Sequence, residues 1–362
     1  MFVTTTYRAF GDVPARYDVL FDRAVRQNFF LSRPWFESLA SALTVGKRLW
    51  VVAVASQGGE PLALLPMVQE PHAHAWTPRL LHGLANYYAP LFGPIVDRNL
   101  FTSEACDALA RALTDTADWD VVDLHPMDAD GGIFDCLTAS LRHAGLWVQS
   151  YFCFANWYLQ VQGRSFEQYY ASLPSILTNT LARKERQVRL KGGARFTIVT
   201  GREGLDSAIR TYEAIYTASW KPPEESPELV RGLICLLADR DWLRLGFLYI
   251  SDAAVAVQLW IVAHGRASIY KLAHLEQFSN LSPGSQLTLE MMRYVLDVDR
   301  VDEVDYLTGD ESYKRNWMSH RRERMGIIAF DPRKLRGLLV GIRHIGGRML
   351  KRALMPAYAS RR

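Results

Sequence analysis

The chain has few cysteines for its length, four in 362 residues. Cys106, Cys136, Cys153 and Cys235 stand far apart and form no C-x-x-C pair. This spacing argues against a structural metal site or a disulfide framework and favours a reducing compartment. Long apolar runs are missing as well, because no stretch reaches the roughly 18 to 20 unbroken apolar residues that span a bilayer. With no basic start followed by an apolar core at the N-terminus, the sequence predicts a cytoplasmic protein.

An excess of positive over negative charge is found at the C-terminal end of the chain and is lacking in the rest. The net charge is +4, but residues 331–362 hold nine Lys/Arg and one Asp, a local balance of +8. The rest of the chain is therefore +4 minus +8, or −4, and gives no general signal for DNA binding. Within this end, residues 333–355 place apolar side chains at helical spacing among arginines and lysines. The pattern predicts an amphipathic helix that docks on an anionic membrane surface, peripheral to the inner face; the alternative is that its apolar stripe packs on the body.

The two halves of the chain follow one pattern of alternating helices and strands, which predicts an α/β fold. In the first half, Leu49–Ala55 and Leu62–Val68 flank a Gly-Gly turn and predict a hairpin. In the second, Leu243–Ile250, Val255–Val262 and Ala267–Leu272 predict an antiparallel meander. A helix and a further strand follow in both halves. We therefore expect two related domains at residues 1–160 and 161–330, followed by a basic tail at 331–362.

The stretch Ser282-Pro283-Gly284-Ser285-Gln286 opens a predicted helix over Pro283–Val298. Ser282 is a favourable N-cap, and Pro283 sits where a first helical turn tolerates proline. Because Gly284 has no side chain, an anionic group can approach the N–H groups of that turn, where the helix dipole attracts phosphate. The sequence thus predicts a phosphate site here; a capped helix without a ligand is the alternative.

Several marks occur in a characteristic order between about Ser175 and Trp317. They are the basic helix residues Arg183, Lys184, Arg186 and Arg189, the segment Ala218-Ser219-Trp220-Lys221, Ser282-Pro283-Gly284, and Gly309 followed by Tyr313-Lys314. In this order they resemble the acetyltransferase domain of the FemAB-like and cellulose-biosynthesis (CelD-like) branch of the GNAT superfamily. The resemblance implies tandem GNAT-like domains built on a mixed α+β sheet. The superfamily's phosphate loop is richer in glycine than this one, so the identity of the donor stays open.

The resemblance also implies an activity and a set of roles. The activity is N-acylation of an amine, such as an amino sugar or a precursor of a cell-surface or exported polymer, from acetyl-CoA or another acyl-CoA without a metal. A backbone N–H of the strand Ala267–Leu272 would polarise the carbonyl, and Tyr313 would protonate the leaving thiolate, unless its ring only packs under a short helix. Asp305 would act as a base or orient one; the alternative, which the residue itself favours, is a structural carboxylate at the end of a strand. The implied donor-binding residues are Ser282, Pro283, Gly284, Ser285, Gln286 and Lys271. The implied acceptor-binding residues are Trp220, Lys314 and Tyr270.

Two other functions fit the same resemblance. One is Fem-like aminoacyl transfer, with charged tRNA as donor. The other is a non-catalytic GNAT-fold module at a membrane surface.

Overall fold

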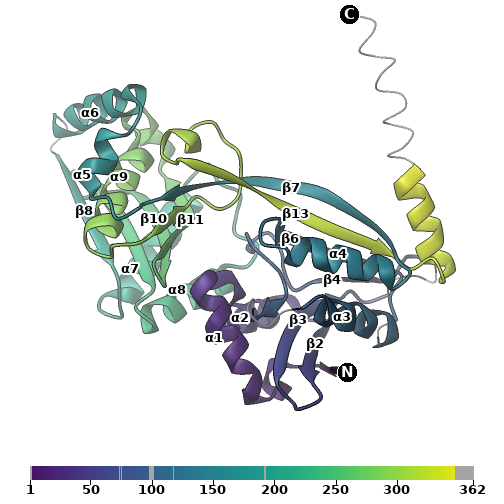
Figure 1. Ribbon diagram of the computed structural model, residues 1–362. Helices are drawn as coiled ribbons and strands as arrows, with labels where there is room; N and C mark the ends of the chain where they lie inside the picture. Colours follow the sequence, from purple (N-terminus) through teal and green to yellow (C-terminus); the bar gives the residue numbers. More distant parts are fainter. Residues whose placement is uncertain are drawn as a thin grey trace, which may run out of the picture. The chain divides into compact units, whose positions relative to one another are not determined.

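The chain folds into two compact units, seen in Figure 1. The computed structural model describes residues 2–346, apart from 73, 75, 98–101, 117 and 191–192. Unit 1 contains the described residues of Met1–Ala24, Phe30–Cys153 and Glu323–Arg362, and unit 2 contains those of Val25–Phe29 and Phe154–Arg322. The predicted boundaries at 160 and 330 differ from these. The chain leaves unit 1 within one long strand and returns within another, so no linker marks either crossing.

Unit 1 is a mixed sheet with the strand order β1-β2-β3-β4-β6-β13 and with β5 paired to β3. All neighbours are antiparallel except β4 and β6, which are parallel. In chain order its elements are β1 (Phe2–Tyr7), α1 (Asp18–Gln27), α2 (Arg33–Leu43), β2 (Arg48–Ser56), β3 (Pro61–Gln69), β4 (Leu80–Gly83), β5 (Ile95–Val96), α3 (Ser103–Thr116), β6 (Val121–Asp128), α4 (Ile133–His143) and β13 (His320–Phe330).

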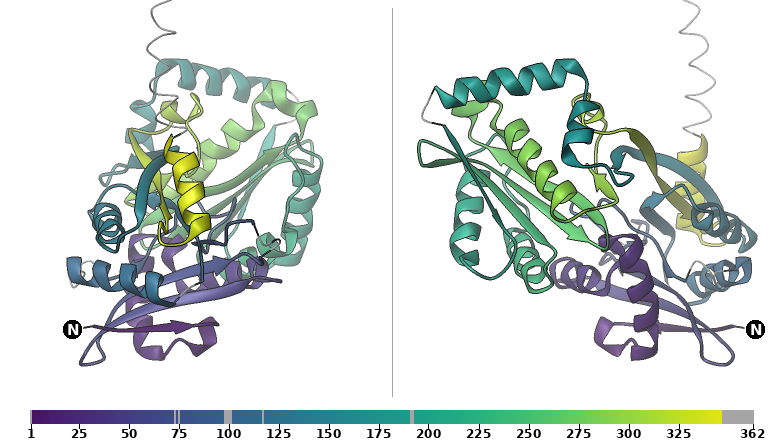
Figure 2. Two further views of the ribbon diagram at one scale, coloured as in Figure 1. Left: turned by 90° about the vertical axis from the view of Figure 1, so that its right-hand side faces the viewer. Right: turned by 60° about the vertical axis from the view of Figure 1, so that its left-hand side comes forward.

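Unit 2 is a mixed sheet with the strand order β7-β12-β11-β10-β9-β8. Helix α9 lies on one face of the sheet, and α7 and α8 lie on the other (Figure 1; Figure 2, right). Its elements are β7 (Trp147–Gln160), α5 (Phe166–Ala171), α6 (Ser175–Arg189), β8 (Ala194–Val199), α7 (Leu205–Thr217), α8 (Pro227–Asp239), β9 (Leu243–Ile250), β10 (Ala253–Ala263), β11 (Arg266–His274), α9 (Pro283–Asp297) and β12 (Glu303–Asp305). Short 3-10 helices occupy Glu276–Leu281 and Lys314–Asn316.

The two units share one order of elements. Unit 1 begins with a strand and two helices (β1, α1, α2), and unit 2 has the same arrangement after β7, α5 and α6 (β8, α7, α8). Three antiparallel strands follow (β2-β3-β4; β9-β10-β11), and then a helix leads to a strand that runs parallel to the last of the three (α3, β6; α9, β12). The predicted hairpin and meander are both present. The prediction of two related domains with mixed sheets is therefore confirmed at the level of fold.

Close packing holds α9 against the sheet of unit 2. Its side chains Met291, Met292 and Val295 are buried with Trp260 of β10. A Cβ added at Gly246 of β9 would overlap the Met291 sulfur, so a larger residue there would force the Met291 side chain to move. Because helices cover both faces, β10 is buried along nearly its whole length, as expected for a central strand. The start of α9 is thus fixed relative to the ends of the strands.

Two sequence interpretations need comment. Cys106 of α3 and Cys136 of α4 form a disulfide, so the expectation of unpaired cysteines was wrong for this pair. The pair forms because α3 and α4 pack together, which the separation of 30 residues does not reveal. The predicted tail helix is present over residues 335–346, and residues 347–355 of that prediction lie outside the described residues.

Candidate functional site

The central strands of unit 2 separate at the middle of β11. The parallel ladder between β11 and β12 ends at Ser268, although β11 continues to His274. Just beyond the end of this ladder β11 bulges at Tyr270, where its register with β10 shifts between Leu259 and Trp260. Among the described residues, the edge of β11 that faces β12 is therefore not paired with β12 beyond Ser268. A ligand carbonyl lying in this gap can accept a hydrogen bond from the strand.

In the chain, helix α9 begins at Pro283, shortly after the part of β11 that is not paired with β12. Ser282 takes the left-handed conformation, with φ +51° and ψ +51°, and its side chain makes no capping hydrogen bond. Ser282 is thus the N-cap residue, as predicted, but its side chain does not cap the helix. Because the Ser282 side chain does not bond to the N–H groups of the first turn, these groups can donate to a ligand. A Cβ at Gly284 would meet only His274 Nδ1, at 3.6 Å, and the first turn carries no acidic residue. These features suit a phosphate group.

The other residues predicted at this helix start divide into two groups. Pro283 and Gln286 are buried, and the Gln286 side chain donates to the Leu281 carbonyl at 2.7 Å. We therefore assign these two a structural role. Ser285 is half-buried and, with Gly284, borders the open side of the turn. A cation is also nearby, since the Lys184 ammonium group donates to the carbonyl of Asn280 in the 3-10 helix that leads into α9.

Three lysines from separate segments converge beyond the end of the β11–β12 ladder. Lys271 of β11 is buried and forms an ion pair with Glu224 of the α7–α8 loop, at 3.0 Å. Burial lowers the pKa of Lys271, and Glu224 opposes that shift. The pKa of Lys221 is lowered by burial and then by the positive charges of Lys271 and Lys314. Burial and the neighbouring positive charges thus disfavour the protonated form of Lys221 relative to that of an exposed lysine.

Tyr313 lies at the edge of the same cluster. Its ring meets the buried ring of Tyr306 edge-on with 5.8 Å between centroids, and 44% of Tyr313 is exposed. Burial of the hydroxyl, and then the charge of Glu311, raise the pKa of Tyr313 to about 12. The phenol thus stays protonated at neutral pH and can donate a proton. The neighbouring Lys314 ammonium group is buried against Glu311 Oε2 at 2.7 Å.

Asp305 lies at the end of β12 and is held on all sides by protein groups. It is buried, and its Oδ1 accepts from Asn156 Nδ2 at 2.5 Å and from the Leu307 N–H at 2.7 Å. Its Oδ2 pairs with Arg322. Because the Asp305 side chain is only 1% exposed and three donors hold its oxygens, a substrate does not reach it, and the geometry favours a structural role over that of a base. We assign Asp305 to holding β7, β12 and the start of β13 together within unit 2.

The remaining predicted residues border the cluster. The Trp220 ring packs on His274 with 4.2 Å between centroids, and the Lys221 ammonium group lies 5.7 Å from the Trp220 centroid. Tyr270 is the bulge residue of β11. His274 escaped sequence analysis, although its ring ends β11 beside Gly284 and its Nδ1 is buried without a hydrogen-bond partner in the described part of the chain. Burial lowers the pKa of His274.

Gly309 fixes the loop between β12 and Tyr313. Its φ is +112°, and an added Cβ would overlap the Glu311 carboxylate, which Lys314 holds. We expect Gly309→Ala to destabilise unit 2 by about 1 to 3 kcal/mol, because both the backbone and the carboxylate must shift. Gly201→Ala is the matched control, since nothing lies within 4 Å of an added Cβ there. Urea unfolding followed by circular dichroism measures both; equal midpoints for the two variants would contradict the expectation.

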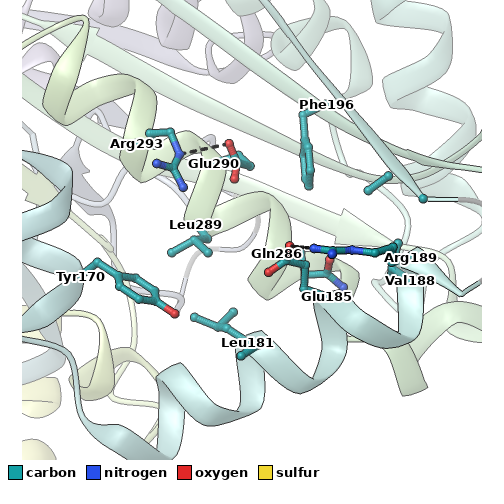
Figure 3. Close-up of a pocket in the computed structure, with 13 residues that line it drawn as sticks. Tyr170, Leu181, Glu185, Val188, Arg189, Phe196, Gln286, Leu289, Glu290 and Arg293 are labelled. Carbon is teal, nitrogen blue, oxygen red and sulfur yellow. Dashed lines mark hydrogen bonds and ion pairs between the residues drawn. The ribbon is translucent and has the colours of Figure 1, made fainter.

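Two cavities lie near these elements. One of about 230 Å³ opens between α7 and α8 and is lined by Tyr212, Tyr216, Lys221 and Glu224, among others. Another of about 310 Å³ lies between α6 and α9 (Figure 3). The charged side chains of the α6–α9 cavity pair with each other, Arg189 with Glu185 and Arg293 with Glu290. The first cavity shares Lys221 and Glu224 with the lysine cluster.

The described residues form neither a metal-binding cluster nor a helix able to span a membrane. Within residues 2–346 and their stated gaps, no group of three or more His, Cys, Asp or Glu side chains is arranged to hold a metal ion. No helix of the same residues combines the length and hydropathy needed to cross a membrane.

Residues 177–315 match the family model described as the acetyltransferase (GNAT) domain. No curated protein matches the chain in sequence. Among solved structures, the chain resembles FemX with 12% identity and a TM-score of 0.59, covering 82% of this chain and 90% of that one. It also resembles the C-terminal domain of a putative lysylphosphatidylglycerol synthetase from Agrobacterium fabrum, with 10% identity, a TM-score of 0.52, and coverage of 84% and 90%. A protein of unknown function from Bacteroides thetaiotaomicron is similar as well, with 12% sequence identity and a TM-score of 0.57, covering 90% of this chain and 100% of that one.

These matches agree with the fold of unit 2 and with the resemblance found in the sequence. The matched residues 177–315 contain the separated strands, the start of α9 and the lysine cluster. The family match supports the prediction of a GNAT-type N-acyltransferase, an enzyme that transfers acyl or aminoacyl groups. GNAT domains generally take acyl-CoA as donor.

Proposed function

We propose that unit 2 transfers an acyl group from an acyl-CoA, acetyl-CoA in the simplest case, to an amine. The observation that carries the proposal is the separation of β11 from β12 next to an uncapped helix start. The gap suits the thioester, and the start of α9 suits the pyrophosphate of the donor. Lys184 adds a positive charge beside that helix start.

The chemistry follows from the groups that surround the gap. The amine attacks the thioester carbonyl, whose developing negative charge is stabilised by a backbone N–H of β11. Collapse of the tetrahedral intermediate breaks the C–S bond, and the thiolate takes the phenolic proton of Tyr313. The proton of the attacking amine passes to water or to a basic side chain beside the gap. The products are an amide and CoA.

We assign this chemistry to unit 2 because the corresponding helix start in unit 1 is unsuited to an anion. In α3, Thr102 Oγ1 accepts a hydrogen bond from the Ala105 N–H, and Glu104 stands in the first turn. A carboxylate in that position repels phosphate. The start of α9 has neither feature.

The acceptor side is the cavity between α7 and α8. Tyr212 and Tyr216 provide aromatic surface there, and Lys221 and Glu224 provide polar groups of both signs, a combination that suits a polar acceptor. The family resemblance adds that the amine belongs to an amino sugar or to a precursor of a cell-surface or exported polymer.

A second candidate is aminoacyl transfer from charged tRNA, in which an ester carbonyl occupies the same gap. The similarity of the fold to FemX favours it, as does the glycine-poor sequence at the start of α9. A GNAT-fold module without catalysis is the remaining reading.

Donor binding separates these functions. We expect acetyl-CoA and free CoA at about 100 times their dissociation constants to add about 2.7 kcal/mol to the free energy of unfolding. For a unit of this size that raises the melting temperature by roughly 5–10 °C. Differential scanning fluorimetry measures the shift. No shift with any acyl-CoA would contradict the thioester donor; charged tRNA is then the next ligand, and the failure of both would leave the non-catalytic module.

A further inference from the structure

The C-terminal helix, described over residues 335–346 and yellow in Figure 1, is fixed to unit 1 along one face. Gly337 and Gly341 are buried, and a Cβ added at Gly341 would lie 3.0 Å from the Trp147 ring and 3.3 Å from Phe330. Just before the helix, the Lys334 ammonium group donates to the Trp119 carbonyl. The helix thus has a defined inner face, and its outer face is available to a partner.

The outer face carries an apolar stripe. Leu335, Leu339 and Ile342 follow each other at spacings of four and three residues, which places them on one side of a helix. They are exposed to 65%, 55% and 53% of their surface, respectively. Large aliphatic side chains with this exposure are unusual in one contiguous row, and such a row marks an interaction surface.

Basic side chains border the stripe on one side. At 100° per residue, Arg336 and Arg343 lie about a quarter turn from the stripe, on the same side of it. Arg343 is exposed, and no carboxylate of the described residues lies within ion-pair distance of it; Arg336 approaches Asp120 at 3.8 Å. Residues 331–362 together carry a charge of +8. The surface is therefore apolar in the middle and positive at its edge.

We propose that this stripe and its basic border dock unit 1 on an anionic lipid bilayer, with the helix lying in the plane of the interface. The aliphatic side chains enter the boundary between headgroups and acyl chains, and the arginines pair with lipid phosphates. The match between a positive border and an anionic surface selects this occupant over a neutral apolar partner. The inference is independent of the transferase activity, which resides in unit 2.

Vesicle co-sedimentation of the full chain tests the proposal. We expect binding to vesicles of phosphatidylcholine with 30% phosphatidylglycerol, weaker binding as salt rises, and little binding to pure phosphatidylcholine. The triple variant Leu335→Ser, Leu339→Ser, Ile342→Ser should bind at least about tenfold more weakly. Arg343→Glu should weaken binding about fivefold or more. Val45→Ser is the matched control, since Val45 is 84% exposed elsewhere in unit 1, and it should bind as the unsubstituted chain does.

The design separates docking from folding and from self-association. Because the three stripe side chains point outward, their replacement should leave the melting temperature unchanged; a drop would show that the stripe packs on the protein and would overturn the proposal. Equal vesicle binding by the triple variant and the unsubstituted chain would overturn it as well. If the unsubstituted chain ignores anionic vesicles but forms a dimer in sedimentation velocity that the triple variant does not, the occupant is a second copy of the chain.

Discussion

Replacement of Gly284 by glutamate should remove donor binding and leave the fold intact. The new carboxylate would stand in the first turn of α9, where a phosphate group of the donor would otherwise approach the backbone. Like charges at this distance repel, and the side chain also fills the approach. We expect the affinity for CoA to fall about a hundredfold or more, equivalent to roughly 2.7 kcal/mol. Isothermal titration calorimetry measures the affinity, and circular dichroism reports on the fold.

Two further variants at the same position separate charge from size. Gly284→Ala should bind CoA nearly as the unsubstituted chain does, because its Cβ makes only an ordinary contact with His274 at 3.6 Å. Gly284→Gln has the size of glutamate without the charge, so it isolates the effect of crowding. If Gly284→Glu binds CoA with unchanged affinity, the phosphates do not lie at the start of α9.

Replacement of Tyr313 by phenylalanine should slow turnover about a hundredfold, the lower end for loss of a general acid. Because its pKa of about 12 keeps the phenol protonated, the hydroxyl group is available to the leaving thiolate throughout the neutral range. The ring remains in the variant, so its edge-on contact with Tyr306 is kept and donor affinity should change little. Release of free thiol from acetyl-CoA, followed with a thiol reagent, measures turnover.

Tyr249→Phe on β9 is the control for loss of a phenol outside the gap, and it should retain full turnover. Turnover of Tyr313→Phe at the rate of the unsubstituted chain would assign Tyr313 to packing. A rise in KM with no change in kcat would instead indicate that its hydroxyl group binds a substrate.

Structural features that depend on neighbouring residues in the sequence could be predicted, whereas features that depend on contacts between distant residues could not. The meander of unit 2 and the Ser-Pro-Gly start of α9 rest on local periodicity and turn chemistry, and both are present. The left-handed Ser282 was missed because a serine before Pro-Gly also fits an ordinary side-chain cap. The pairing of Cys106 with Cys136 depends on two helices packing together, which no local pattern expresses.

The same limit explains the candidate site. Asp305 was read as a possible base because a carboxylate at a strand end often faces a cleft. Its partners Asn156 and Arg322 come from other strands, so only the fold shows that its oxygens are occupied. Glu224 lies in a proline-rich loop and meets Lys271 of β11 across 47 residues of sequence. The sequence shows an acidic residue in this loop and a lysine in the central strand β11, but nothing in it indicates that Glu224 and Lys271 pair with each other.

The route of the chain through β7 and β13 has a consequence for biosynthesis. Unit 1 is discontinuous: β13 pairs with β6, and buried Ile327 and Phe330 belong to it, yet these residues follow all of unit 2 in the chain. When the first 153 residues have been synthesised, β6 can pair with β4 but not yet with β13. The whole of unit 2 must be synthesised before β13 can cover the other edge of β6. Nascent unit 1 carries an open sheet edge during this interval, a state that invites strand pairing with other chains. Maturation of the N-terminal half is thus coupled to completion of the C-terminal half, and a fragment ending at residue 153 should aggregate where one that also supplies residues 323–346 does not.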